Sequence, residues 1–425
     1  MAIPSSGTLL QGVVSLLQAL LLDRRYFWAL AGLAVLADAV LTQLVIRFVG
    51  FTEIDYETYI EHITLFVKGE RDYSQITGPS GPLVYPAGHV WIHWVLRHVT
   101  ADPATGAILV RTAQQIYGTL YLWTLLVSCQ VYQQAGGMPN YVILPLIFSK
   151  RLHSIFVLRL FNDCWAIAIM MTAIAAYQKR WLKVGTTLYA LALSVKMNIL
   201  LYLPGILVIL VQTAGLFAGL GHIALVISIQ GLLALPFLNT HPKEYLSNAF
   251  NLSRVFLYKW TVNWRFVPED VFLSAAFAKS LLAMHVLLLV LFGLKWCQPD
   301  GGVLSVIQRT LSRPRGGSGV TPLSADRIAT ILFTSNLLGI IVARSLHYQF
   351  YSWYAQQLPF LLWHTKYPTA IRLVLLLAIE YSWNVFPSTH LSSGILLICN
   401  TAILAGVYFG YPHGRITVSA GKKEI

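Results

Sequence analysis

The sequence predicts an all-α, polytopic membrane protein of about twelve transmembrane helices, with about ten as the lower bound. Composition predicts this class first, because the 425 residues are 56% hydrophobic and only 11% charged. Pattern predicts it next, because apolar runs long enough to cross a bilayer recur along the whole chain. Clusters of Lys and Arg fall at alternate connections between these runs, as expected when basic loops stay in the cytosol.

The predicted spans follow one another along the chain. They cover residues 27–48, 107–132, 140–150, 154–177, a broken pair within 184–213, 217–237, 272–296, 328–345, 351–364, 367–385 and 391–410. Arg24 and Arg25 place the N-terminus in the cytosol, so the first span leads to the opposite side. An even number of spans returns the tail, 411–425, to the cytosol.

Three longer connections complete what is predicted to be a single transmembrane domain, 1–425. Two of them, 50–106 and 238–271, fall on the non-cytosolic side and are expected to contain short helices. The third, 297–327, is a low-complexity cytosolic linker that is expected to be solvated and flexible.

Charge and cysteine content exclude other classes of protein. The formal charge of +13 is explained by cytosolic basic loops and phosphate contacts, so no nucleic-acid partner is expected. The four cysteines have no paired spacing, which predicts neither a disulfide framework nor a zinc site. The first apolar segment is too long for a cleavable signal peptide and is expected to remain as a span.

The connection 50–106 contains the best candidate for a catalytic motif. Its acidic stretch begins at Glu53-Ile-Asp55 and runs to Glu61, directly after the first span. The segment 78–88 follows, and its prolines and glycines fix the backbone in a turn-rich loop. Residues 89–98 predict an interfacial helix. Carboxylates beside a membrane, in a chain with so few charges, indicate a functional site.

Polar residues in or beside later spans collect on the same predicted side. They are Arg159, Asn162, Asp163, Lys196, Asn198, Arg254, Lys259, Arg265, Arg344, His347, Tyr348 and Gln349. An ionisable group at the centre of a span costs about 2.5–3.5 kcal/mol, so such groups usually mark a site or a structural pair. Basic residues on this side oppose the cytosolic bias, and a lipid-linked phosphate would compensate their charge.

Some of these residues also have a purely structural interpretation. Asp55 could cap a short helix, because Thr52-x-x-Asp55 matches a capping box. Arg159 and Asp163 are spaced i, i+4 and could pair with each other.

Four further residues have structural interpretations of other kinds. Asp38 lies within the first span and is expected to contact a neighbouring helix. His347 and Trp264 could be interfacial residues at the membrane surface. Asn251-Leu-Ser253 is a formal glycosylation sequon that is expected to stay unused.

Six collinear motifs carry a resemblance to a known family. They are Thr52-Glu-Ile-Asp-Tyr56, the loop 78–88, Leu158-Arg-Leu-Phe-Asn-Asp163, Ser194-Val-Lys-Met-Asn198, the segment 254–266 and Arg344-Ser-Leu-His-Tyr-Gln-Phe-Tyr351. Together they resemble the dolichyl-phosphate-mannose-dependent alpha-1,3-mannosyltransferases of the endoplasmic reticulum, over about 27–410. The tail Lys422-Lys-Glu-Ile425 is similar to a cytosolic dilysine retrieval signal.

The resemblance implies a GT-C glycosyltransferase with its active site on the lumenal side, under the first outer loop. It implies inverting transfer of mannose from dolichyl-phosphate-mannose to a lipid-linked Man5GlcNAc2 acceptor. Inversion needs one base to take the acceptor proton, for which Asp55 is expected and Glu53 is second. The leaving phosphate needs cationic stabilisation and no general acid.

The remaining site predictions come from the same motifs. Candidates for binding the donor phosphate are Lys196, Arg344, His347, Arg265 and Arg159. Candidates for other substrate contacts are Tyr56, Tyr85, Asn162, Asp163, Asn198, Trp264, Tyr348 and Gln349. No cofactor is expected, and the expected partners are the donor lipid, the lipid-linked acceptor and membrane lipids.

Two alternatives remain open at the level of sequence. Glu53 and Asp55 could hold a divalent metal against a phosphate and so act as ligands instead of a base. The chain could also be a lipid or sugar transporter, although transporters usually contain internal repeats and none is evident here.

Overall fold

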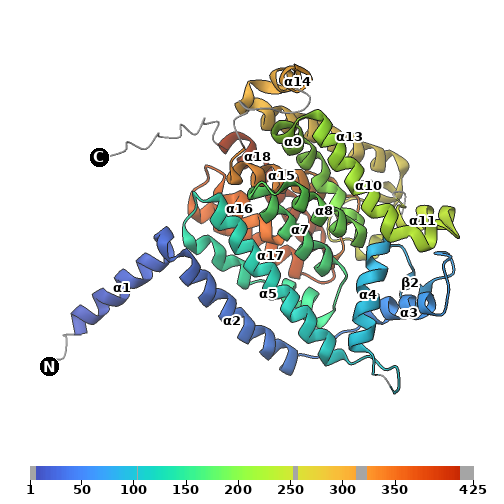
Figure 1. Ribbon diagram of the computed structural model, residues 1–425. Helices are drawn as coiled ribbons and strands as arrows, with labels where there is room; N and C mark the ends of the chain where they lie inside the picture. Colours follow the sequence, from blue (N-terminus) through green and yellow to red (C-terminus); the bar gives the residue numbers. More distant parts are fainter. Residues whose placement is uncertain (1–5, 103, 252–256, 313–322, 412–425) are drawn as a thin grey trace, which may run out of the picture.

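The computed structural model describes residues 6–102, 104–251, 257–312 and 323–411, which form an all-helical bundle (Figure 1). The longer helices are α1 Ser6–Leu22, α2 Phe27–Phe48, α3 Tyr56–Val67, α4 Ala87–Thr100, α5 Val110–Ala135, α7 Asp163–Gln178, α8 Leu182–Val195, α9 Leu203–Ala214, α10 Leu216–Leu238, α13 Ala275–Cys297, α14 Gly302–Ser312, α15 Ala325–Val342, α17 Thr369–Asn384 and α18 His390–Gly410. The shorter ones are α6 Lys150–His153, α11 Pro242–Ala249, α12 Glu269–Leu273 and α16 Leu358–Trp363.

The described chain contains six single helices that are long and apolar enough to cross a membrane. They lie within Arg24–Phe48, Met197–Ala214, Leu216–Leu238, Ala275–Asp300, Ala325–Val342 and His390–Gly410. A seventh crossing is added if Asn140–Ile147 and Lys150–Leu158, which meet at a bend of 49°, form one broken span. The protein is therefore an all-α polytopic membrane protein, and the count of about twelve spans stays a prediction.

Three predicted elements differ from the structure. The predicted span 154–177 begins only at Asp163, because Ser154–Leu158 forms the separate turn η3. The predicted span 351–364 is not one helix, because the 3-10 turns η7 Tyr348–Trp353 and η8 Ala355–Gln357 precede the short α16. Pro359, in the first turn of α16, has no amide hydrogen with which to continue a preceding helix. The predicted linker 297–327 is also helical over α14, while 313–322 lies outside the described residues.

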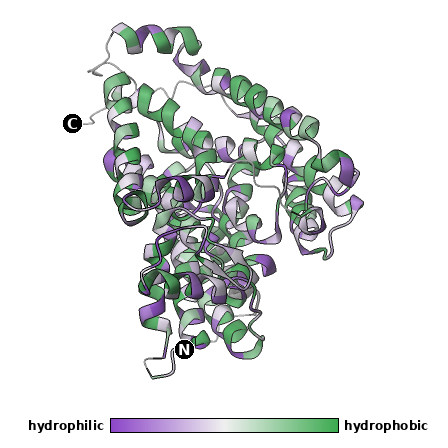
Figure 2. Ribbon diagram, turned by 90° about the vertical axis from the view of Figure 1, so that its right-hand side faces the viewer, coloured by the Kyte–Doolittle hydropathy of each residue, from purple (hydrophilic) through white to green (hydrophobic). Residues whose placement is uncertain are grey.

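Burial separates the helices into a centre and a periphery. The apolar window of α15 is 78% buried, whereas those of α10 and α13 are only 11% buried. Helix α7 contacts α5, α8 and α15, so these helices form the centre of the bundle. Figure 2 shows hydrophobic residues along most of the long helices, as expected when the outer ones face lipid.

The connection 50–106, predicted to be the first outer loop, folds against one end of this bundle, which we call the α3–α4 end (Figure 1). The helix predicted at 89–98 is present as α4, which contacts α3, α8 and α10. The turn-rich segment forms a small hairpin of β1 Thr77–Gly78 and β2 Gly81–Pro82. The connection 238–271, predicted to be the second outer loop, contains α11, the turn η5 Tyr258–Trp260 and the start of α12, which agrees with the prediction of short helices.

Gly88 allows α4 to approach α8 closely. A Cβ atom at this position would lie 2.0 Å from Ser194 Oγ and 2.8 Å from the Ser194 carbonyl oxygen. Such contacts cannot be relieved by a side-chain rotation alone, because one of the atoms belongs to the backbone. His89, which follows Gly88, and Lys196, two positions after Ser194, both belong to the candidate site described below.

Substitution Gly88→Ala is therefore expected to lower the free energy of unfolding by about 1–3 kcal/mol. The measurement is thermal unfolding of the purified protein in detergent. Gly293→Ala is the matched control, because a Cβ atom at Gly293 in α13 meets nothing within 4 Å. That control should be neutral or more stable by at most about 1 kcal/mol. Equal melting temperatures for the two variants would show that α4 and α8 are not in tight contact.

Candidate active site

The acidic motif is attached to the start of α7 by its backbone. The Thr52 amide donates to the Leu158 carbonyl oxygen at 2.9 Å. Leu158 ends the π-helical turn η3 Ser154–Leu158, and α7 begins five residues later at Asp163. This bond brings the sequence motifs around residues 52–56 and 158–163 together at the α3–α4 end.

Glu53 caps helix α3. Its Oε1 accepts the Glu57 amide at 3.1 Å, so its carboxylate satisfies a free backbone donor in the first turn of the helix. Burial raises the pKa of Glu53, against the lowering effect of the Glu57 amide. Glu53 therefore has a structural role, whatever it contributes to chemistry.

Asp55 occupies the N-cap position of α3, but its side chain makes no capping hydrogen bond. The proposed capping box at Thr52 and Asp55 is therefore wrong, because Glu53 supplies the capping oxygen instead. Asp55 Oδ2 accepts the Tyr59 hydroxyl at 3.4 Å, one helical turn further on. The side chain is partly exposed, so its carboxylate combines a positioning contact with access from outside the protein.

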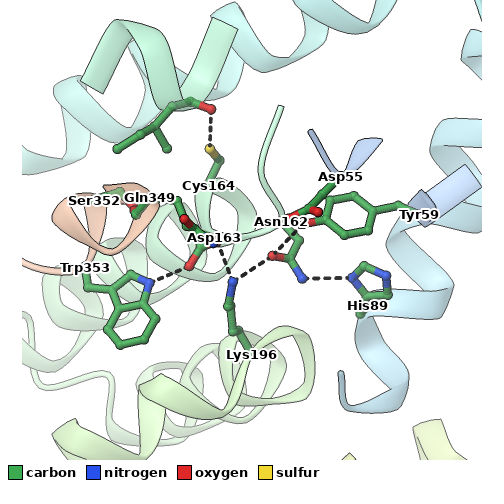
Figure 3. Close-up of polar contacts among 11 residues, drawn as sticks. Asp55, Tyr59, His89, Asn162, Asp163, Cys164, Lys196, Gln349, Ser352 and Trp353 are labelled. Carbon is green, nitrogen blue, oxygen red and sulfur yellow. Dashed lines mark hydrogen bonds and ion pairs between the residues drawn. The ribbon is translucent and has the colours of Figure 1, made fainter. Parts of the chain in front are cut away.

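Asn162 connects this carboxylate to the interior (Figure 3). Its Oδ1 accepts the Lys196 ammonium at 3.0 Å and lies 3.3 Å from the Tyr59 hydroxyl, whose single proton is shared between this oxygen and Asp55 Oδ2. Its Nδ2 donates to His89 Nδ1 at 3.1 Å, which requires a neutral imidazole. Burial and the neighbouring His93 lower the pKa of His89 well below its usual value, which keeps the ring neutral. The orientation of the Asn162 amide is thus fixed from both sides.

Lys196 and Asp163 form a buried ion pair at the centre of this network. Lys196 Nζ lies 2.5 Å from Asp163 Oδ2, and the Trp353 indole donates to Asp163 Oδ1 at 2.5 Å. Asp163 is fully buried in the first turn of α7, where the helix dipole favours a negative charge. Lys196 lies between the end of α8 and the start of the turn that follows it. Its backbone is extended, which agrees with the break predicted at 194–198.

The proposed pair between Arg159 and Asp163 is wrong. Arg159 donates to the Ser154 hydroxyl, and Asp163 pairs with Lys196. The two residues are not on one helix, because Leu160 between them has a φ of 51° and interrupts the helical backbone. The spacing i, i+4 therefore gives no common helix face here.

The second outer loop is tied to the segment after α15. The Trp264 indole donates to the Ala343 carbonyl at 2.8 Å, and the Val262 amide donates to the Leu346 carbonyl at 2.7 Å. Arg344 donates to the Phe272 and Leu273 carbonyls at 2.8–3.2 Å. In this structure Arg344 and Trp264 thus hold the loop in place.

Three predicted residues lie on or beside η7. The His347 ring stacks on Phe350 at 5.3 Å between centroids, and Phe350 stacks on Trp353 at 3.9 Å. The Tyr348 hydroxyl donates to the Val385 carbonyl at 2.7 Å. The Gln349 carbonyl accepts the Ser352 hydroxyl at 2.8 Å (Figure 3). The aromatic stack thus links His347 to the tryptophan that binds Asp163.

Three other candidates differ in their surroundings. Tyr56 is fully buried and its hydroxyl bonds Thr100 at 3.1 Å, so it faces the protein core. Tyr85 lies over His89 at 4.5 Å and beneath the Lys196 ammonium at 5.3 Å. The side-chain amide of Asn198 is buried with no hydrogen-bond partner among the described residues.

The interhelical contact predicted for Asp38 is confirmed, because its Oδ1 lies 2.6 Å from His153 Nε2 in α6. The sequon at Asn251 and the predicted polar residue Arg254 reach positions 252–256, which lie outside the described residues.

Sequence reasoning missed three members of the network, Tyr59, His89 and Trp353. Tyr59 follows Asp55 by one helical turn, and His89 directly follows the rigid loop 78–88. Trp353 lies two residues after the motif that ends at Tyr351. Their proximity to the motifs was the available signal, although contact across the fold could not be inferred from it.

Comparison with known proteins identifies the family. The sequence model described as ALG3 protein matches residues 32–393, most of the chain. The chain belongs to the ALG3 family. This ALG3 match includes every predicted site residue, from Glu53 to Gln349, and excludes the tail.

Individual ALG3 relatives are similar over almost their whole length. A protein of Arabidopsis thaliana is 41% identical over 383 residues, which cover 88% of this chain and 86% of that protein. One of Homo sapiens is 42% identical over 397 residues, with 92% and 89% covered. One of Cryptococcus neoformans is 41% identical over 436 residues, with 98% and 96% covered. All three are named Dol-P-Man:Man(5)GlcNAc(2)-PP-Dol alpha-1,3-mannosyltransferase. No solved structure matches the chain.

Proposed function

We propose that this ALG3 protein transfers mannose from dolichyl-phosphate-mannose to lipid-linked Man5GlcNAc2, forming an alpha-1,3 linkage with inversion. The similarity to relatives with that printed name, across about nine-tenths of both chains, supports the substrates. The single structural observation that supports the chemistry is the carboxylate of Asp55, which lies in the acidic motif and makes no capping hydrogen bond to α3.

The proposed step is one displacement at the anomeric carbon. The acceptor hydroxyl oxygen forms the new bond to that carbon, and its proton passes to the Asp55 carboxylate. The bond from the anomeric carbon to the phosphate oxygen breaks, and its electron pair stays on the dolichyl phosphate. Tyr59 positions Asp55 through their hydrogen bond, and Asn162 positions Tyr59. Cationic side chains stabilise the departing phosphate.

We place this reaction in the endoplasmic reticulum membrane, with the α3–α4 end in the lumen and both termini in the cytosol. Arg24 and Arg25 before the first span support this orientation through the charge bias of cytosolic loops. The transporter alternative is weaker, because the relatives are named as transferases.

The test is to incubate the purified protein with dolichyl-phosphate-mannose and Man5GlcNAc2 diphosphate-dolichol, then to analyse the product linkage. We expect a six-mannose product that an alpha-1,3-specific mannosidase shortens by one residue. Translocation of either lipid across a vesicle membrane without formation of the product would support the transporter alternative instead.

Activity is expected to persist in EDTA, because side chains instead of a metal neutralise the departing phosphate. No group of three or more His, Cys, Asp and Glu side chains in the described ranges is arranged to hold a metal ion. The measurement is turnover in EDTA, and then after addition of manganese or magnesium. Loss of turnover in EDTA with recovery on adding metal would make Glu53 and Asp55 ligands.

A further inference from the structure

Three arginines are linked to Tyr348 or to one another by electrostatic interactions. Arg151 lies in α6, Arg159 lies directly after Leu158, and Arg265 lies in the second outer loop. Arg151 and Arg265 both act electrostatically on the Tyr348 hydroxyl, and Arg159 acts on Arg151. We call these residues the arginine cluster. Arg151 is absent from the residues that the motifs predicted.

Arg151 is the member of the cluster whose guanidinium contacts only an aromatic ring within the described chain. Its guanidinium lies 4.9 Å from the centre of the Tyr348 ring, and its Nε is buried without a hydrogen-bond partner. Its side chain makes no hydrogen bond or ion pair with any residue that the structure describes. The Nη donors of this half-buried guanidinium are thus left for a ligand or water.

The other two arginines also keep unused donors. Arg265 lies 4.2 Å over the Tyr258 ring and donates from Nη1 to the Tyr258 carbonyl at 2.9 Å, while its Nε is buried without a partner. Arg159 donates only to the Ser154 hydroxyl within the described chain. The Thr52 bond to Leu158 brings the residue next to Arg159 into contact with the acidic motif.

The arginine cluster has an uncompensated positive charge. Among the described residues, no carboxylate lies within 4.0 Å of any of the three guanidiniums. The carboxylate that acts on Arg151 is Glu380, which accepts Ser149 at 3.1 Å and Asn384 at 3.0 Å instead. Three arginines against one glutamate leave a net charge of about +2, which is costly beside a membrane unless an anion binds.

The positive charge of Lys196, unlike that of the arginine cluster, is compensated by a carboxylate. Its charge is already balanced by Asp163 at 2.5 Å, and its remaining contacts are Asn162 and the rings of Tyr85 and Phe350. A phosphate would therefore gain more from the arginine cluster than from Lys196.

We infer that Arg151, Arg159 and Arg265 bind the phosphate group of the prenyl phosphate donor, with Arg151 as its innermost contact. This inference rests on the proposed function for the identity of the lipid. Planar guanidiniums suit a phosphate, because each can donate two parallel N–H bonds to its oxygens.

The charge of the cluster also suits the reaction. The donor is a phosphodiester with one negative charge, and the departing dolichyl phosphate is a monoester that approaches two. A net charge of about +2 therefore balances the departing dolichyl phosphate better than it balances the donor. The cluster thus stabilises the negative charge that develops on the leaving phosphate.

The experiment measures binding separately from transfer, in the Asp55→Asn background. The probes are farnesyl phosphate, farnesol as its uncharged counterpart, and farnesyl diphosphate as a mimic of the acceptor head group. We expect Arg151→Gln to weaken binding of farnesyl phosphate by about 10- to 100-fold, the usual effect of losing a hydrogen bond to a charged group. Binding of farnesol should not change.

Two further variants control for folding and for charge. Arg71→Gln is the matched control, because Arg71 is also half-buried at the α3–α4 end and lies 4.1 Å over an aromatic ring, that of Phe66. It should bind farnesyl phosphate like the parent. Arg151→Lys keeps the charge and loses the planar fork, so it should fall between the parent and Arg151→Gln. It also supplies a folded variant if Arg151→Gln is unstable.

Each other outcome overturns the inference. Unchanged binding of farnesyl phosphate by Arg151→Gln would make Arg151 structural. Selective loss of farnesyl diphosphate binding would assign the cluster to the acceptor lipid. An equal loss in Arg71→Gln would show a general effect of removing positive charge. Because binding is measured without turnover, an Arg151-dependent phosphate site would survive even if the mannose-transfer assay failed.

Discussion

The Asp55→Asn protein is expected to fold normally and bind donor lipid, but to turn over at least about a hundredfold more slowly. Asparagine keeps the shape of the side chain and an oxygen that can still accept the Tyr59 hydroxyl. What it loses is the ability to take the acceptor proton. Loss of a general base typically costs about 10²–10⁴ in rate, or about 3–5 kcal/mol of barrier.

Two comparisons make the Asp55 result specific. Glu61→Gln removes an exposed carboxylate from the same helix and should leave turnover unchanged. Glu53→Gln keeps an oxygen for the Glu57 amide, so it should preserve the cap of α3 and reduce turnover by less than about tenfold. If Glu53→Gln were instead the slow variant and Asp55→Asn turned over normally on the lipid-linked acceptor, Glu53 would be the base.

The sequence predicted those parts of the fold that depend on local pattern. Apolar run length predicted the long helices α2, α10, α13 and α18, because a segment that faces lipid must satisfy its backbone internally. The polar residues at 194–198 predicted the break between α8 and the helix that follows. Segment 351–364 was mistaken for a span because its composition is apolar, although η7, η8 and α16 are buried in protein and not exposed to lipid.

The site was predicted as a set of residues but not as a set of contacts. The motifs named Asp55, Asn162, Asp163 and Lys196, and the structure joins all of these in one network. Their partners could not be predicted, because contacts such as Trp353 to Asp163 connect positions 190 residues apart. The arrangement of Arg159 depends on one backbone angle at Leu160, which no spacing rule contains.

The second large effect is expected from breaking the buried ion pair. Asp163→Asn should lower the free energy of unfolding by about 3–5 kcal/mol, because it leaves the Lys196 ammonium buried without its counter-charge. The side chain of Asp163 is fully buried and that of Lys196 is 11% exposed, so water cannot replace the lost partner without rearrangement. The measurement is chemical or thermal unfolding of the purified protein in detergent.

The double variant Asp163→Asn with Lys196→Met decides whether this loss comes from the charge or from the shape of the site. Each single change leaves one buried charge unpaired, whereas the double change removes both, so it should be more stable than Asp163→Asn alone. A double variant as unstable as the sum of the single ones would mean that the pair contributes no coupling. The same variant tests Lys196 against the arginine cluster. Because the charge of Lys196 is already balanced by Asp163, it contributes little to phosphate binding. Farnesyl phosphate should therefore bind the double variant nearly as well as the parent. A large loss of binding would instead identify Lys196 as the residue that binds the phosphate.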